Sequence, residues 1–509
     1  MNAHRAAVRG AVWNLLGYLI AGGAALALPF VLVKGVGRGA YGVYSYVVLL
    51  LTQSYLLLGG LGEALAYYLA NRQSEAKWWI RQALGAALFT GGVGLALWVW
   101  RGPEMIAWLL ALDASWKALL REVRIVAGLA LVGYAVAILL GWVPLALGRH
   151  RGLVLLPIGQ TIAQVVFPMG VVLMFPGDVR RLLEVSLYGG MGLGVYMWAA
   201  ISTLMREPLW PLFGWQAWKA LWKRGLWQNL SQWNGLFLTF FERTVIGRWA
   251  SLSYMGLYSA GQYFSAKAFQ VLYKGVESLL PAFGGEASLW RRHLRLGQTM
   301  WLVALFTGPL LMLTYGIGRV GLPYFVRPWG IVEMRLWGGV IVTTQFLFLL
   351  APLMPFFTGQ GRFRIFYLYS LIVALFHVGG TLWLVPRGYY YWGPVVGGIG
   401  GLFFLTGFVF KGWGVSGLWR VWVWYPLWRL LIGWGIALGP LVVGGIDRGI
   451  WSLLMSVVGV GVFLISEKHN RFWPRKRDFL AQAWRGVWGF LSSRVKAIQN
   501  RITRAQAVP

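Results

Sequence analysis

The sequence predicts an all-α integral membrane protein with 14 transmembrane helices, arranged as two pseudo-symmetric six-helix lobes around a central cavity plus two extra helices. Three observations predict this class. Hydrophobic residues make up 58% of the 509 residues and charged residues only 12%, against about 25% charged residues in soluble domains. Long apolar runs recur along the chain, and residues 1–100 match residues 215–314 at one constant offset.

Each apolar run is long enough to cross a bilayer, which takes roughly 20 residues of helix. The first run lacks the small-residue cleavage site of a signal peptide, so we expect it to be retained. The second and eighth runs are longer than a bilayer requires, and we expect their ends to tilt or to project into water. The 14 runs lie at 12–33, 41–69, 82–100, 125–147, 153–175, 184–204, 227–247, 254–284, 299–318, 336–357, 365–385, 392–410, 427–445 and 450–466.

The net charge of +31 is spread over the short gaps between apolar runs. A nucleic-acid-binding protein would gather these cations on a soluble domain, so we exclude nucleic acid as a partner. Lys and Arg are more numerous on the side that holds both termini, which the positive-inside rule places in the cytoplasm. The charge pattern therefore predicts a multi-pass protein of a bacterial or archaeal cytoplasmic membrane. The absence of Cys excludes disulfides and thiolate metal sites.

The phrase YGVYS around Gly42 returns as MGLYS around Gly256, 214 residues later. The same offset places Glu63 on Glu277, although acidic residues are scarce in this chain. Because the offset covers six apolar runs, both copies keep the same orientation, which is the parallel repeat found in many transporters. The alternative is chance similarity between helices that are rich in Gly, Leu and Tyr.

The repeat divides the chain into five parts. The first lobe covers 1–205 with helices 1–6, a cytoplasmic amphipathic linker covers 206–226, and the second lobe covers 227–411 with helices 7–12. Helices 13 and 14 occupy 412–466, and a basic amphipathic cytoplasmic tail occupies 467–509. Trp, Leu and Ile recur at helical spacing in the tail, so we expect it to lie on anionic membrane lipids. A solvated basic tail is the alternative.

Several stretches resemble a known family of transporters. LALPFVLVKGVGRGAYGVYSY and GGLGEALAYYLANR resemble the start of polysaccharide-transporter (Wzx-type) flippases, which belong to the multidrug/oligosaccharidyl-lipid/polysaccharide exporter superfamily. The segment ERTVIGRWASLSYMGLYSAGQYFSAKAFQVLYKGVESLLPAF resembles the start of the second lobe in that family, and LALGRHR resembles its loop between helices 4 and 5. The similarity covers roughly residues 10–150 and 225–300. This chain departs from the family at Glu242-Arg243, where many relatives have a lone acid.

The resemblance implies a flippase that moves a lipid-linked, undecaprenyl-type oligosaccharide across the membrane for export of a surface polysaccharide, such as a lipopolysaccharide. It also implies a polysaccharide polymerase and glycosyltransferases as partners. Such a substrate carries sugars and a pyrophosphate, and transferring that head through hydrocarbon without compensation is very unfavourable. A cationic, water-filled cavity would remove this barrier, so ionisable residues within the apolar runs are the first candidates for the site.

Lys267 and Lys274 lie seven residues apart, two helical turns on one face of the eighth run. We interpret them as cavity cations that bind phosphate, with Glu277 beside Lys274 to adjust its charge. The alternative is that these lysines extend to the interface, because the eighth run is longer than the membrane.

Four further cations close the first and seventh runs, and we expect them at the outer mouth of the cavity. They either bind phosphate there or anchor the helices at the interface. These residues are Lys34, Arg38, Arg243 and Arg248.

Two acids within the apolar runs, Glu63 and Glu277, are candidates for coupling transport to H⁺ or Na⁺. A structural pair with Lys or with the backbone is the alternative. Gln228 and Gln232 lie near one face of the seventh run and are candidates for lining the cavity or for joining helices by hydrogen bonds. His377 lies alone in the eleventh run, where it either packs helices through a hydrogen bond or relays protons. We expect no other cofactor and no metal site.

Two other functions remain open from the sequence. A cation-coupled multidrug antiporter has the same fold, and a multi-spanning membrane glycosyltransferase is a third candidate. Motifs for nucleotide binding or for a zinc protease are absent from the sequence. The longest predicted external loop, 101–124, holds Glu104, Asp113 and Glu122 without a grouping that predicts catalysis. The sequence therefore favours a transporter over an enzyme.

Overall fold

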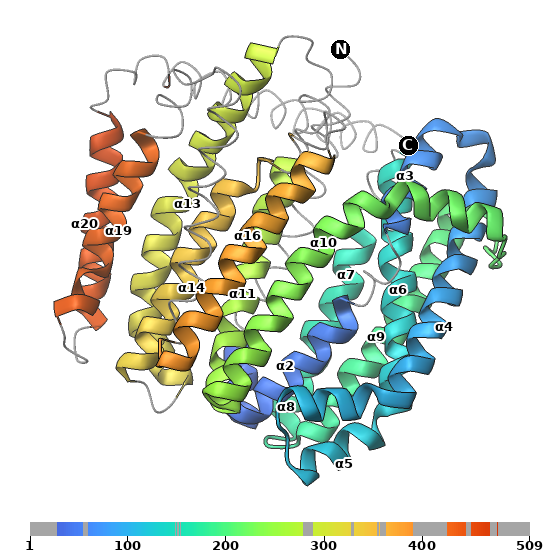
Figure 1. Ribbon diagram of the computed structural model, residues 1–509, viewed down its shortest axis with the longest axis horizontal. Coiled ribbons are helices and arrows are strands. Elements are labelled where there is room, and N and C mark those ends of the chain that lie inside the picture. Colours follow the sequence, from blue (N-terminus) through green and yellow to red (C-terminus); the bar gives the residue numbers. More distant parts are fainter. Residues whose placement is uncertain are drawn as a thin grey trace, which may run out of the picture.

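The computed structural model describes residues 28–53, 60–147, 154–277, 289–326, 330–353, 363–389, 425–443 and 449–468, with the single residues 149, 152, 356 and 476. Within these ranges the regular structure is entirely helical (Figure 1). This confirms the predicted all-α class. The predicted run at 392–410 and nearly all of the tail lie outside the described residues.

The long helices follow the predicted apolar runs closely, and most extend beyond them at one or both ends. Two short 3₁₀ turns lie at Gln73–Glu75 and Val385–Arg387, and a π-helical segment at Ile162–Val166 joins α7 to α8. The helices are α2 (Arg38–Gln53), α3 (Leu61–Asn71), α4 (Ala76–Leu109), α5 (Ala114–Glu122), α6 (Arg124–Ala146), α7 (Leu155–Thr161), α8 (Phe167–Met174), α9 (Val179–Met205), α10 (Trp215–Trp249), α11 (Leu252–Glu277), α13 (Leu289–Phe325), α14 (Ile331–Leu350), α16 (Phe363–Leu384), α19 (Tyr425–Val443) and α20 (Gly449–Lys468).

Five helical stretches in the described part are long and apolar enough to cross a membrane. They establish a multi-pass membrane protein, whereas the full set of 14 spans stays a prediction. These stretches are Ala76–Leu109, Arg124–Pro144, Leu155–Met174, His293–Tyr324 and Ser370–Arg387.

Three local features differ from the sequence-based expectation. The second run is not one helix: α2 ends at Gln53, and α3 begins after Gly60, which has a φ of 70°. A Cβ on Gly60 would lie 2.4 Å from the carbonyl oxygen of Gly225, so glycine permits both the turn and the close passage of α10. From Trp215 onward, the predicted linker forms one continuous helix with the seventh run, α10. The predicted external loop is also largely helical, because α4 extends to Leu109 and Asp113 caps α5 by accepting from the Trp116 amide (3.1 Å).

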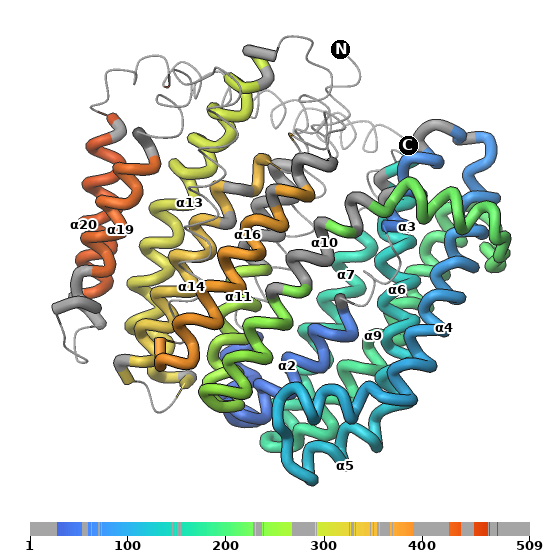
Figure 2. Tube along the Cα trace, viewed as in Figure 1, coloured from blue at the N-terminus to red at the C-terminus, as the bar shows by residue number. Residues whose placement is uncertain are grey.

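The helices fall into two groups with three helices between them (Figure 1). Helices α3 to α9 lie on one side, and α13, α14, α16, α19 and α20 lie on the other, with α2, α10 and α11 in the middle, as the tube in Figure 2 also shows. A large buried apolar cluster joins α2 to α11, and a second cluster lies among α13, α14, α19 and α20. The central helices thus connect the two groups.

The two copies of the repeated phrase touch each other where α2 crosses α11. A Cβ on Gly42 would lie 2.6 Å from the carbonyl oxygen of Leu252, and a Cβ on Gly256 would lie 1.9 Å from that of Arg38. Under the offset of 214, Gly42 corresponds to Gly256 and Arg38 corresponds to Leu252. The contact is therefore reciprocal, which is the pattern that a two-fold axis generates. A local two-fold relation at this crossing supports duplication over chance similarity.

We expect Gly256→Ala to destabilise the protein, because the new methyl group would collide with the backbone of α2 and force the helices apart. The loss should be about 1–3 kcal/mol, the range for overpacking, seen as a lower Tm in detergent. Gly92 on α4 is the matched control, since nothing lies within 4 Å of its Cβ position. Gly92→Ala should leave the Tm unchanged or raise it through helix propensity. Equal Tm values for Gly256→Ala and the parent would show that the crossing tolerates separation.

Candidate functional site

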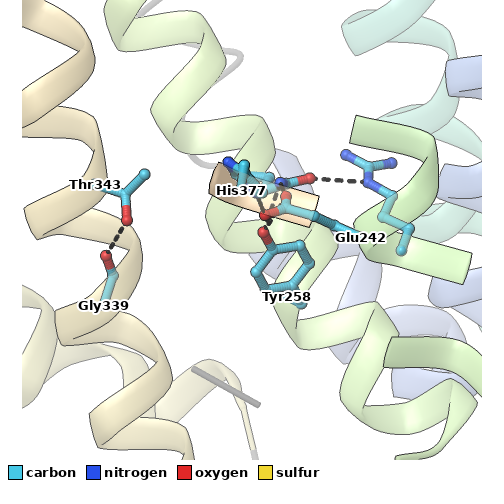
Figure 3. A network of polar contacts seen from close by, with 7 residues as sticks. Glu242, Tyr258, Gly339, Thr343 and His377 are labelled. Atoms are coloured by element: carbon cyan, nitrogen blue, oxygen red, sulfur yellow. Dashed lines mark hydrogen bonds and ion pairs between the residues drawn. The ribbon is translucent and has the colours of Figure 1, made fainter. Parts of the chain in front are cut away.

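A buried polar network lies where α10, α11 and α16 meet (Figure 3). Glu242 and Arg243 come from α10, Tyr258 and Gln262 from α11, and His377 from α16. Glu242 is 2% exposed and Arg243 is 5% exposed. Charged side chains at such depth in a membrane protein are functional candidates by default.

The Glu242 carboxylate accepts hydrogen bonds from two neighbouring helices. Its Oε2 accepts from the Tyr258 hydroxyl (2.5 Å) and from the Gln262 amide (2.6 Å), and its Oε1 contacts the His377 Nε2 (Figure 3). Tyr258 and Gln262 are four residues apart on α11, so both side chains lie on one face of that helix. These partners compensate the carboxylate for the loss of water.

Arg243 is bonded to the same network through Gln262. Its Nε donates to the Gln262 Oε1 (3.0 Å), while the Gln262 amide nitrogen donates to Glu242, so one amide bridges the cation and the anion. An Arg243 Nη also donates to the carbonyl oxygen of Ser45 on α2 (3.3 Å). The network therefore links α2 to α10, α11 and α16. We call the residues before α10 the first half of the chain and the residues from Trp215 onward the second half, so the network joins the two halves.

The carboxylate and imidazole together can hold and release a proton. Glu242 and His377 form one of the contacts between α10 and α16, and its strength depends on whether the imidazole carries a proton. No group of three or more His, Asp or Glu side chains suited to a metal ion occurs among the described residues.

The structure gives the four predicted mouth cations different surroundings. Arg243 is buried in the network. Arg38 pairs with Glu333 on α14 through an Nη1–Oε1 distance of 2.9 Å. Lys34 and Arg248 are exposed, and the Arg248 guanidinium lies 5.8 Å from the centre of the Trp108 ring. A shared phosphate-binding role for these four stays a prediction.

The side chains of the remaining predicted site residues lie outside the described residues. Their helices are placed, but their surroundings are not, so their roles also stay predictions. They are Glu63 on α3, Gln228 and Gln232 on α10, and Lys267, Lys274 and Glu277 on α11.

The pairing of Glu242 with His377 was missed by sequence reasoning. The two residues are 135 positions apart, and no local spacing connects them. Each carried a separate signal: Glu242 stood out against the resembled family, and His377 stood alone in an apolar run. Together, two isolated ionisable residues in apolar helices could have suggested a pair, because buried charges in membranes find partners.

Comparisons with known proteins find similarity at the level of structure. No protein-family model matches the chain, and no curated protein matches its sequence. A solved structure of the "Lipid II flippase MurJ, inward closed conformation" matches with a TM-score of 0.68 and 12% identity, over 92% of this chain and 100% of that one. An inward-facing multidrug resistance MATE family transporter of the MOP superfamily matches with a TM-score of 0.58 and 14% identity, over 81% of this chain and 99% of that one. A MOP superfamily transporter from Pyrococcus furiosus matches with a TM-score of 0.60 and 13% identity, over 82% and 96%.

These sequence identities are low, so the similarities show the fold alone. The three matched proteins are a flippase and two transporters. They agree with the superfamily of the predicted resemblance and do not single out its Wzx-type member. The chain has the fold of the MOP-superfamily transporters.

Proposed function

We propose that the protein is a MOP-type transporter that flips a lipid-linked oligosaccharide across the cytoplasmic membrane by alternating access. The observation that carries this proposal is the extent of the structural match. The match to the lipid II flippase covers 92% of this chain at a TM-score of 0.68, against 81% at 0.58 for the MATE transporter. A fold shared with a lipid flippase over nearly its whole length favours a substrate of the same kind.

The repeat and the fold support two lobes around a cavity. The reciprocal contact of Gly42 and Gly256 is what two related lobes would form at their shared axis. In this proposal Lys267 and Lys274 supply the cavity cations that compensate the desolvation of the pyrophosphate, while the lipid tail stays in the bilayer. The polymerase, the glycosyltransferases and the tail-bound anionic lipids belong to the same proposal.

Contacts between the two halves of the chain gather at the end where α2, α11 and α14 begin. Besides the glycine crossing, Arg38 pairs with Glu333, and the Tyr46 hydroxyl bonds to the Thr244 hydroxyl (2.8 Å). Positive-inside orientation would make this the outer end. We assign these contacts to a conformation that is closed on the outside, which must break when the lobes rock.

The Glu242–His377 pair is our candidate for ion coupling, and we assign the proton as the ion. The pair lies in a network that reaches α2 through Arg243, so a proton bound there would alter the contact between the halves. Glu63 and Glu277 stay candidates for the same role. The same buried pair would serve a multidrug antiporter, which is the second candidate function.

The substrate is tested with the purified protein in vesicles that contain a fluorescent undecaprenyl-pyrophosphate oligosaccharide. The parent should flip this lipid, and Lys267→Gln/Lys274→Gln should slow flipping by about tenfold or more, because each lysine supplies a charge-assisted hydrogen bond of about 1.5–3 kcal/mol. Lys117→Gln on α5 is the control and should flip at the parent rate. Equal rates for the double variant and the parent would remove the two lysines from the site. A parent that exports cationic dyes and moves no lipid would establish the antiporter instead.

The closed outer end is tested by charge reversal. Arg38→Glu should weaken the contact with Glu333 and favour opening, by about 1 kcal/mol for a partly exposed pair, or roughly fivefold in the equilibrium. The chain contains no cysteine, so maleimide labelling of Ser259→Cys, at a position that is buried in the repeated phrase on α11, reports opening of the crossing. Arg38→Glu/Glu333→Arg should restore the slow labelling. Arg121→Glu, which breaks an ion pair between α5 and α4 within the first half, should leave labelling unchanged.

Proton coupling is tested by measuring flipping between about pH 5.5 and 8, because the rate of a proton-coupled transporter depends on the proton concentration. The parent rate should change across this window, and His377→Gln and Glu242→Gln should flatten the profile while flipping persists. His293, a buried histidine on α13, is the control, and His293→Gln should keep the parent profile. An unchanged profile in both network variants would exclude the pair as the coupling site.

A further inference from the structure

The segment between α9 and α10 presents large apolar side chains outward. Trp210 is 61% exposed, and Trp215 at the start of α10 is 59% exposed. Leu212 and Phe213 between them are also exposed. A contiguous apolar patch of this kind marks a surface that is covered by a partner or a membrane. We name residues 207–214 the interfacial strap.

Hydrogen bonds hold the backbone of the interfacial strap on the bundle. The Leu212 amide donates to the Arg81 carbonyl oxygen (3.0 Å), and the Arg81 Nε donates to the Trp210 carbonyl oxygen (3.0 Å). The Trp198 indole donates to the Leu209 carbonyl oxygen (2.8 Å). A Cβ on Gly85 would lie 2.2 Å from the Leu212 carbonyl oxygen, so α4 lies directly beneath the strap. The apolar side chains therefore project from a fixed backbone.

The interfacial strap continues the lipid-facing surface of α4. The Phe213 ring lies 4.9 Å from the ring of Phe89, which is itself exposed on a candidate membrane span. Exposed apolar side chains on a span face acyl chains. The strap therefore lies where that span meets the interface, the depth at which Trp is enriched in membrane proteins.

Cations surround this apolar surface. Lys219 and Lys223 are exposed, one turn apart on α10, and the neighbouring rings of Trp215, Trp218 and Trp222 stack on each other at 4.6 and 5.5 Å. Arg224 is also exposed, and its guanidinium lies 3.6 Å from the centre of the Tyr67 ring.

Carboxylates are scarce on the same surface, and cations already neutralise them. Residues 72–81 and 206–224 contain only Glu75 and Glu207 as acids. Glu75 pairs with Arg72 (3.5 Å), and Glu207 pairs with Lys77. The hydrogen bond from the Lys77 ammonium holds the pKa of the Glu207 carboxyl below its usual value, so this acid stays ionised and paired. Neither carboxylate in residues 72–81 and 206–224 therefore neutralises Lys219, Lys223 or Arg224. Their positive charge is available to an anionic partner outside these two segments.

We propose that the interfacial strap and the first two turns of α10 form a binding surface for anionic phospholipids of the adjacent leaflet. Trp210, Phe213 and Trp215 enter the acyl region, and Lys219, Lys223 and Arg224 bind the phosphodiester. The occupant is a membrane lipid such as phosphatidylglycerol, since a lipid satisfies both the apolar patch and the cations and the patch continues the surface of a candidate membrane span. This site is separate from the tail and from the cavity, and it does not depend on what the protein transports.

Lipid bound here would fix the start of a helix that reaches the polar network. Helix α10 runs without a break from Trp215 to Trp249 and carries Glu242 near its far end. At 1.5 Å per residue, its 35 residues span about 52 Å. The composition of one leaflet can thereby influence the position of the network through one rigid element.

The test counts phosphatidylglycerol and phosphatidylcholine bound to the full-length protein by native mass spectrometry, after extraction from equimolar vesicles. The parent should retain phosphatidylglycerol preferentially. Lys219→Gln/Lys223→Gln/Arg224→Gln should lower the ratio of the two lipids about fivefold, and Lys219→Arg/Lys223→Arg should keep it. Arg101→Gln/Lys117→Gln/Arg121→Gln removes equal charge from the opposite end of the bundle and should keep the parent ratio. Trp210→Ser/Phe213→Ser should lower retention of both lipids.

Four results would overturn the proposal. The triple α10 variant could retain phosphatidylglycerol at the parent ratio, which leaves the surface to another partner such as a protein. The control variant could lose as much phosphatidylglycerol, which shows a general charge effect. Soluble glycerol phosphate could raise the Tm of the parent as much as phosphatidylglycerol does, which assigns the cations to a free phosphate. The Tm of the parent in vesicles with increasing phosphatidylglycerol gives a second measure that needs no variant, and a Tm that does not rise would also count against the proposal.

Discussion

The close crossing of α2 and α11 at Gly42 and Gly256 is the contact on which the centre of the structure depends. Two glycines let the helix backbones approach without side chains between them, as is common in membranes, where packing replaces the hydrophobic effect between helices. This approach places the Ser45 carbonyl within reach of Arg243 and the Tyr46 hydroxyl within reach of Thr244. A crossing with larger residues would separate α2 from α10 and break both bonds.

Because its charged members are buried, the polar network near this crossing needs all of its hydrogen-bond partners. Glu242 and Arg243 are neighbours in the chain and are both buried, so each needs partners that the lipid cannot provide. Gln262 supplies them jointly, because one amide group donates to the carboxylate and accepts from the guanidinium. Four helices, α2, α10, α11 and α16, contribute groups to this arrangement. Losing any one partner would leave another buried polar group unpaired.

Helix α10 connects this network to the surface at the opposite end of the bundle. Its start packs on α3 and α4, with Gly60 allowing the close approach of Gly225, and its end packs on α11 and α16. The exposed Trp and Lys side chains lie at the start, and the buried acid lies near the end. A single helix that touches both halves of the chain is suited to pass a change at one end to the other, because helices resist bending where no break interrupts them.

The sequence alone determined the class of the protein and its internal repeat. Composition and run length fix an all-helical membrane protein because only closed hydrogen bonding within helices satisfies the backbone in lipid. The constant offset predicted a duplication, and the structure places the two copies of the phrase against each other. The resemblance also predicted the fold of the MOP-superfamily transporters. Tertiary structure decided the rest. Glu242 and His377 are far apart in the sequence and meet where α10 packs on α16. Gly60 interrupts the second run where α10 passes against it, and from Trp215 the linker continues into the seventh run as one helix. Local periodicity records which residues are apolar, whereas contacts between helices depend on how the whole bundle packs, so no single stretch of the sequence contains them.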